Sequence, residues 1–429
     1  MVTQQSRLGR GGRSIEKLPR TKLYTLAFAI APYAAYERMR GGGNTLAPVE
    51  LAPGVPATLV LSYPTAVRIL NDPERFPADP RVWQKSLGEE HPLLPMLQWR
   101  PNALRCAGKE HTRYRDALIQ ATAAVDLHAV RDRTIRVAVS LINRLLEIAD
   151  YRETVGLYVV EVIDHYITPL VFTVLNEVVG CPPDIGQRLR RAFAAMFEGI
   201  DTEEVNAEVA SALVELLALK HAVPGEDIAS RLVHQCGGLS DEERMAQLVT
   251  IYSAGIEPVR NLIANTMRRM LTDARYRHDN HNFTPPVEDA VEETLADDPP
   301  MANLCNSYPR QPVLVDGVWL PAHQPVLVSM AACNTDPAIV GDKGWTDNKS
   351  HLAFGSGPHA CLDIARGMTK QIAVQAIAQF FDAFPEAELA IPAHEVAWRP
   401  GPFHRAPAAV PVAVPSTPPL IIPPAPIRR

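Results

Sequence analysis

Phe354-Gly-Ser-Gly-Pro-His-Ala-Cys361 is the most informative stretch of the sequence. It places a cysteine at the end of a glycine-rich turn, directly before an amphipathic run over residues 364–381 that predicts a helix. The free N–H groups and the positive end of a helix N-terminus help to keep a thiolate ionised. Cys361 is therefore predicted to be a metal-binding thiolate covered by Phe354. Gly355 and Gly357 would let the backbone approach a flat cofactor, and a buried structural cysteine is the alternative.

Composition limits the class of protein. Of the 429 residues, 47% are hydrophobic and 21% are charged, which is enough for a large core. The formal net charge of −6 provides no global basic field for nucleic acid. The six cysteines are scattered without a CxxC pair, which suits a reducing compartment and a single functional thiolate. We therefore expect a cytoplasmic protein without a nucleic-acid partner.

Both ends of the chain are predicted to lie outside the main domain. An apolar run over residues 23–36 superficially resembles a signal peptide, but it is shorter than the ~20 residues that span a bilayer. We interpret it as the first packed helix, with no membrane span, after a flexible arm over residues 1–18. Residues 409–414 predict a last edge strand, and the proline-rich tail 415–429 predicts an extended or disordered segment.

Between the ends, the hydrophobic pattern predicts a mainly α protein with small β-sheets, in one domain over residues 19–414. Residues 48–71 predict a strand, a turn, a second strand and a helix. Helical periodicity is found over residues 127–149, 155–180, 186–197, 203–220, 226–235 and 241–272. Asp184 and Ser240 supply N-cap chemistry. Short strands are expected at 313–315, 318–320 and 326–329, the first two joined by a hairpin turn at Asp316-Gly317.

Two further stretches carry candidate functional residues. In Glu110-His-Thr-Arg-Tyr-Arg115, His111 and Arg115 lie four residues apart and therefore on one face of a predicted helix. Two donors on one face suit a pair of carboxylates, and a solvated basic face is the alternative. In the middle of helix 241–272, Ala254-Gly255 would let a flat ligand or O₂ approach the backbone, and Pro258 removes a helical N–H.

Together these blocks resemble the cytochrome P-450 family over about residues 30 to 414. The resemblance implies the single-domain cytochrome P-450 fold, with haem b (iron protoporphyrin IX) as cofactor and Cys361 as its axial thiolate. It also implies that His111, Arg115 and His359 bind the haem propionates. Electrons would come from NAD(P)H through a ferredoxin reductase and a ferredoxin.

The family's central helix carries an acid–threonine pair that delivers protons during oxygen activation. Glu257 matches the acid, whereas Pro258 stands at the threonine position. The resemblance makes Glu257 a candidate catalytic acid acting through water, with Gly255 and Pro258 beside it. A salt bridge of Glu257 with Arg260 or another base is the alternative.

The family's Glu-x-x-Arg helix is also altered. Glu293 is followed at the arginine position by Ala296, and the segment 345–351 lacks the arginine that normally joins this glutamate. The strand arginine expected near Ser307 is missing too, which leaves one fewer propionate donor. A buried carboxylate without a partner costs on the order of 3–5 kcal/mol. We therefore expect Glu293 to lie near solvent or to have a new partner.

The resemblance implies oxidation of a small specialised metabolite. Phrases at 48–61, 255–258 and 398–400 resemble atypical actinobacterial P-450s, some of which couple aromatic substrates through C–C or C–N bonds, for example tryptophan-containing cyclic dipeptides. Hydroxylation of a natural-product intermediate, a peroxide-driven haem enzyme and a non-catalytic haem sensor are the alternatives. Residues expected to line the substrate pocket, or else to pack in the core, are Met96, Trp99, Ala254, Asn303 and Phe403.

Basic residues near the cysteine loop suggest where an electron donor docks. Arg113, Arg366 and Lys370 lie on the predicted helices that flank the loop, and an acidic ferredoxin would complement them. Solvated surface charge is the alternative. The remaining cysteines and histidines show no metal-ligand spacing.

Overall fold

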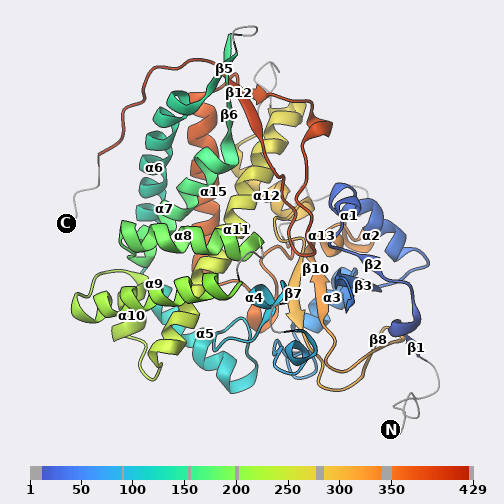
Figure 1. Ribbon diagram of the computed structural model, residues 1–429. Coiled ribbons are helices and arrows are strands. Elements are labelled where there is room, and N and C mark those ends of the chain that lie inside the picture. Colours follow the sequence, from blue (N-terminus) through green and yellow to red (C-terminus); the bar gives the residue numbers. More distant parts are fainter. Residues whose placement is uncertain are drawn as a thin grey trace. The chain divides into compact units, whose positions relative to one another are not determined.

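A computed structural model describes residues 12–88, 91–152, 156–198, 202–276, 285–340 and 350–424. Its internal contacts divide the chain into two compact units. The first comprises residues 1–113, 301–360 and 400–404, and the second comprises 114–300, 361–399 and 405–429. The described residues form many helices and three small sheets, so the predicted fold class, mainly α with small β-sheets, is confirmed (Figure 1).

The first unit is built on a five-stranded sheet. Its strands, in order across the sheet, are β2 (Thr21–Lys22), β3 (Leu46–Ala52), β4 (Val55–Val60), β10 (Val326–Ser329) and β7 (Asn303–Ser307). The short helices of this unit are α1 (Leu26–Ile30), α2 (Pro32–Arg40), α3 (Tyr63–Leu70), α4 (Leu94–Leu97), α13 (Met330–Asn334) and α14 (Pro337–Val340). β3 pairs antiparallel with β4, and their buried side chains share one core with α2, α3 and α13. The order predicted over residues 48–71 is confirmed.

A three-stranded sheet of the first unit contains the predicted hairpin. Its order is β1 (Arg13–Ser14), β9 (Val318–Leu320) and β8 (Val313–Val315). Asp316 and Gly317 join β8 to β9 with φ angles of +47° and +76°, the left-handed conformation that a tight hairpin turn requires. β1 pairs parallel with β9, so regular structure begins inside the arm predicted over residues 1–18.

The apolar run at 23–36 forms two short helices rather than one. α1 ends at Ile30, and Pro32 occupies the first position of α2, where the missing proline N–H is tolerated. Within the described ranges, no helix combines the length and the hydropathy needed to cross a membrane.

The second unit consists mainly of helices (Figure 1). They are α6 (Leu127–Ile148), α7 (Thr168–Val179), α8 (Pro183–Glu198), α9 (Thr202–Ala222), α10 (Ile228–His234), α11 (Asp241–Thr272), α12 (Val287–Asp297) and α15 (Asp363–Ala383). α5 (Gly108–Thr122) carries residues of both units. α15 packs against α6 and α11. The helices predicted within 127–149, 186–272 and 364–381 are confirmed; Ser240 caps α11, whereas Asp184 lies inside the first turn of α8.

The helix predicted over 155–180 is wrong in its first part. Leu157–Glu161 forms strand β6, and α7 begins only at Thr168. The run Leu-Tyr-Val-Val is aromatic and β-branched, and so short an apolar run suits a strand as well as a helix. A four-stranded sheet has the order β11 (Glu388–Leu389), β12 (Pro411–Val414), β6 and β5 (Asp150–Arg152). β12 pairs with β6 and is therefore an inner strand, not the edge strand that the sequence predicts.

The chain after β12 contains no helix or strand over residues 415–424. The Leu420 backbone exchanges two hydrogen bonds with the Asn143 side chain of α6, at 2.8 and 2.9 Å. This part of the proline-rich tail is thereby attached to the second unit.

Candidate functional site

The cysteine loop has the turn and the following helix that the sequence predicts. Gly357–His359 form a 3₁₀ turn, and α15 begins at Asp363, directly after Cys361 and Leu362. Gly355 and Gly357 have φ angles of +70° and +71°, which favour glycine. A Cβ on Gly357 would lie 2.2 Å from the carbonyl oxygen of Leu70. Gly357 is therefore needed for packing against the end of α3, and its approach to a cofactor stays a prediction.

Cys361 lies among basic groups of the second unit. Burial raises the pKa of the Cys361 thiol, while the charges of Arg366 and Arg115 act to lower it. Arg366 Nε also donates a hydrogen bond of 3.1 Å to the Cys361 carbonyl oxygen. A bound metal cation would favour the thiolate form of a sulfur in these surroundings.

Arg115 is placed by α5. Burial lowers the pKa of Arg115, and the Cys361 sulfur is the main influence that opposes this change. The preceding residue, Tyr114, donates a hydrogen bond of 2.8 Å from its hydroxyl to Glu243 at the start of α11. This contact fixes the rotation of α5 at the position where Arg115 projects.

His111 and His359 lie together in the first unit. Their ring centroids are 4.0 Å apart, with an interplanar angle of 41°. His359 Nδ1 lies 3.1 Å from the carbonyl oxygen of Ala103, and because a carbonyl only accepts, Nδ1 carries the proton. The structure thus brings these two predicted propionate ligands together. The ring centroids of Phe354 and His351 lie 6.0 Å apart. That Phe354 covers the Cys361 sulfur stays a prediction.

Glu257 is buried in α11 and has basic partners. Arg399 Nη1 donates to Glu257 Oε1 at 2.5 Å, and Arg260 Nε lies 3.8 Å from Oε2. Asn261 Nδ2 also donates to Oε1 at 3.1 Å. The salt bridge considered as the alternative for this carboxylate is therefore present. Arg399 could not be assigned to it from sequence spacing, because the two residues lie 142 positions apart.

The small residues beside Glu257 do not form an obvious ligand surface. Gly255 packs against α7, where an added Cβ would lie 3.0 Å from Leu175 Cδ2. Ala254 is exposed, and Pro258 lies inside α11 as the sequence predicts. Helix–helix packing accounts for Gly255, and the catalytic roles of Gly255 and Pro258 stay predictions.

Glu293 has new partners, which confirms the expectation drawn from its missing arginine. Arg275 donates to its two carboxylate oxygens at 3.0 and 2.7 Å, and Arg269 Nη1 lies 3.4 Å from Oε2. The Glu293 side chain is 33% exposed, so it also reaches solvent. Ala296, at the usual arginine position, is buried. The two arginines that contact Glu293 lie in α11 and in the turn that follows it.

The residues expected in the substrate pocket lie mostly in packed surroundings. Asn303 is fully buried, accepts from the Tyr36 hydroxyl at 3.0 Å and donates to the Pro402 carbonyl at 3.1 Å. Phe403 belongs to the core of the first unit, and Met96 packs against that core. The Trp99 ring lies 5.2 Å from the Arg81 guanidinium. Core packing, the alternative interpretation, accounts for Asn303 and Phe403.

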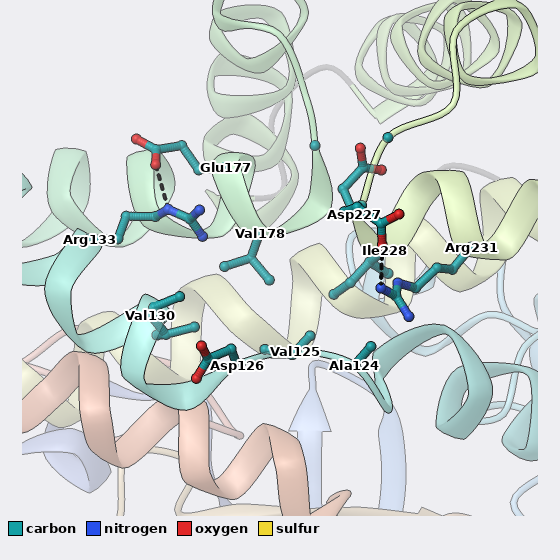
Figure 2. A pocket seen from close by; sticks show the side chains of 14 residues that line it. Ala124, Val125, Asp126, Val130, Arg133, Glu177, Val178, Asp227, Ile228 and Arg231 are labelled. Atoms are coloured by element: carbon teal, nitrogen blue, oxygen red, sulfur yellow. Dashed lines mark hydrogen bonds and ion pairs between the residues drawn. The ribbon is translucent and has the colours of Figure 1, made fainter. Parts of the chain in front are cut away.

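A surface hollow of about 330 Å³ lies in the second unit, between α6, α7 and α10 (Figure 2). Both arginines that line it are ion-paired, Arg133 with Glu177 at 2.5 Å and Arg231 with Glu226 at 3.0 Å. None of the predicted site residues lines it. Over the described ranges, no group of three or more His, Cys, Asp or Glu side chains could hold a metal ion.

Basic residues expected to receive a ferredoxin have partners within the chain. Arg366 lies 3.7 Å from Asp363 and contacts the Cys361 carbonyl, and Lys370 pairs with Glu292. Arg113 is exposed on α5. The docking surface therefore stays a prediction, and Arg113 is its most accessible member.

Comparison with known proteins gives consistent relatives. No family model matches the chain. It is 28% identical over 398 residues to the cytochrome P-450 monooxygenase PikC of Streptomyces venezuelae, covering 90% of this chain and 91% of PikC. It is 28% identical over 374 residues to a 2-hydroxy-5-methyl-1-naphthoate 7-hydroxylase of Streptomyces carzinostaticus, covering 82% and 88%. The solved structure of CYP154C4 from Streptomyces sp. superposes with a TM-score of 0.81 at 24% identity, covering 93% and 99%.

Proposed function

We propose that this chain, an oxidoreductase that belongs to the cytochrome P-450 superfamily, oxidatively couples a small aromatic specialised metabolite through a C–C or C–N bond. The observation that carries the haem-thiolate part of this proposal is Cys361, a half-buried cysteine near Arg115 and Arg366 that lies two residues before the start of α15. The coupling part rests on the sequence phrases shared with atypical actinobacterial P-450s and on Pro258 at the threonine position.

The residues present fit a haem. Cys361 offers one thiolate as the iron ligand, and Arg115, His111 and His359 offer N–H donors that suit two propionate carboxylates. The Nδ1–H of His359 donates to the Ala103 carbonyl and holds the ring in one orientation, so Nε2 would donate to a propionate only in the doubly protonated imidazolium. When bound, the haem would supply the activation of O₂ with electrons from a ferredoxin, a ferredoxin reductase and NAD(P)H.

Proton handling at α11 differs from the usual arrangement. Pro258 has no hydroxyl, and the Glu257 carboxylate is held by Arg399, Arg260 and Asn261. A carboxylate so engaged must first take up a proton before it can donate one, and protonation breaks a buried ion pair, which costs several kcal/mol. We therefore assign no proton-transfer step to Glu257 and infer that it holds α11 to the segment around Arg399.

Hydroxylation is the second candidate, since the relatives include a 2-hydroxy-5-methyl-1-naphthoate 7-hydroxylase. Turnover with a ferredoxin, a ferredoxin reductase and NAD(P)H separates the two. Candidate substrates are indolic cyclic dipeptides and small polyphenols, first selected by the ferric spin shift on binding. Coupling gives a product that has lost two hydrogens and contains no label from heavy-isotope O₂. A labelled product would contradict coupling in favour of hydroxylation, and ligand binding without any product would indicate a sensor.

A further inference from the structure

Arg105 is a buried guanidinium without a carboxylate partner among the residues that the structure describes. It lies in the first unit, three residues before the start of α5, and is 6% exposed. Its Nη2 donates to the Met96 carbonyl oxygen at 2.7 Å. Burial lowers the pKa of Arg105, and the groups that oppose this change are Tyr308 and Cys305 rather than a carboxylate. Arg100 adds a second positive charge nearby, and a buried cation in such surroundings is costly unless an anion completes them.

Two neighbouring polar side chains, Asn306 and Tyr308, have no well-placed partner beyond one another among the described residues. Both polar atoms of Asn306 and the hydroxyl of Tyr308 are buried with no well-placed hydrogen-bond partner among the described residues. Burial raises the pKa of Tyr308 to about 12, and the charge of Arg105 and a hydrogen bond with the Asn306 side chain oppose that rise. The Tyr308 ring is held by Trp83, with centroids 5.4 Å apart. Buried polar groups are normally satisfied, so this cluster requires a further group.

The chemistry of the missing group follows from the donors. Arg105, the Asn306 amide and the Tyr308 hydroxyl all donate hydrogen bonds, and Arg105 adds a positive charge. A carboxylate accepts several hydrogen bonds and supplies the compensating charge. The electrostatic neighbours of Arg105, Cys305 and Tyr308, bracket the end of β7 at Ser307. This is the position where a strand arginine is expected and missing in the sequence.

We propose that Arg105, together with Asn306 and Tyr308, binds a haem propionate and supplies from the loop before α5 the guanidinium that β7 lacks. This proposal rests on the proposed haem-thiolate function. Arg105 is thus a cofactor-positioning residue in this chain, with Met96 fixing its guanidinium and Trp83 fixing the Tyr308 ring.

The test measures haem release from the ferric holoprotein to excess apomyoglobin, and the propionate bending vibration by resonance Raman. Because a hydrogen bond to a charged group contributes about 1.5–3 kcal/mol, Arg105→Gln should release haem roughly ten- to hundredfold faster and shift the vibration. Arg105→Lys, which keeps the charge, should show a smaller acceleration. Arg310→Gln, an exposed arginine of the same unit, serves as the matched control and should match the wild type.

Tyr308→Phe keeps the ring and removes only the hydroxyl, so it tests the site if Arg105→Gln fails to fold. It should shift the propionate vibration and accelerate haem release severalfold. Unchanged release and an unchanged vibration in a folded Arg105→Gln or Tyr308→Phe protein would overturn the proposal. Loss of binding of a carboxylate-bearing aromatic, tested with indole acetate, with haem release unaltered would assign the cluster to substrate and equally overturn it.

The two proposals fail in different ways. If the wild type binds haem with a thiolate-type carbon monoxide adduct but Arg105→Gln behaves like the wild type, only the role of Arg105 is lost. If the purified wild type binds no haem, the proposed function and the role of Arg105 both fall.

Discussion

At the scale of single residues, Glu257 stands at the acid position of the central-helix motif but lies in a buried ion pair. Its carboxylate is 5% exposed and contacts Arg399 and Arg260. The Arg399 backbone N–H donates to the Ala406 carbonyl at 3.0 Å, which fixes the arginine independently of its ion pair. The pair therefore connects the middle of α11 to a later segment of the second unit. Removing one partner of such a pair leaves an uncompensated buried charge.

We predict that Glu257→Gln lowers the free energy of unfolding by about 3–5 kcal/mol, measured by denaturant titration of the haem-bound protein. Glu242→Gln, an exposed change on the same helix, should have little effect. A double-mutant cycle with Arg399→Gln should give a strong coupling energy, because the two groups are in direct contact. Normal stability of Glu257→Gln, with NAD(P)H oxidation diverted to peroxide, would instead support proton delivery by Glu257.

At the scale of elements, the cysteine loop depends on backbone geometry that few residues allow. Gly357 and Gly54 have similar φ angles, +71° and +76°. A Cβ on Gly357 meets the Leu70 carbonyl at the end of α3, whereas a Cβ on Gly54 meets nothing within 4 Å. Comparing alanine substitutions at these two glycines therefore separates the free-energy cost of left-handed backbone, which both share, from the cost of a steric clash, which only Gly357 has.

We predict that Gly54→Ala costs roughly 1–2 kcal/mol of stability, the ordinary penalty of left-handed backbone for a residue with a Cβ. Gly357→Ala should cost more and lower the haem content of the purified protein, since the carbonyl of Leu70 cannot give way without moving α3. Haem per protein, measured by the pyridine haemochrome assay, tests this difference. Equal haem content in the two variants would contradict the role given to Gly357.

At the scale of the whole molecule, similarity to the relatives extends along most of the chain, and the proposed electron transfer depends on a surface that another protein recognises. Arg113 is exposed, and Arg366 and Lys370, which are partly exposed, contact acidic side chains. Long-range steering of an acidic ferredoxin would fall with ionic strength.

We predict that Arg113→Glu slows reduction by an acidic ferredoxin at low salt, with the difference from the wild type shrinking as salt increases. Stopped-flow reduction kinetics over a salt series measure this effect. Arg131→Glu, an equally exposed change on α6, should leave the rate near that of the wild type. A substrate-induced spin shift of normal size shows that the variant is intact, and identical kinetics in both variants would remove Arg113 from the docking surface.

The sequence predicts the local structure of this molecule well where the signal comes from residues that are close together in the chain. The capping box of α11, the Asp316-Gly317 turn and the helix after Cys361 all follow from neighbouring residues. It fails where a partner comes from far along the chain. Leu157–Glu161 suits a strand or a helix by its local pattern, and its pairing with β12, about 250 positions later, decides for the strand.

The candidate site shows the same limit. Spacing alone places His111 and Arg115 on one helix, and the motif places His359 beside Cys361. It does not reveal that Glu293 is paired by Arg275, or that Arg105 lies near Tyr308. Such replacements depend on three-dimensional proximity between side chains on different elements, which a single sequence does not encode locally.

The central claim is that the Cys361 sulfur is the axial ligand of a bound haem iron. The absorption spectrum of the freshly reduced carbon monoxide adduct tests it directly, in the wild type and in Cys361→Ala. We predict a thiolate-type band in the wild type that Cys361→Ala loses. An imidazole-type band in the wild type, or a spectrum that survives unaltered in Cys361→Ala, would contradict it.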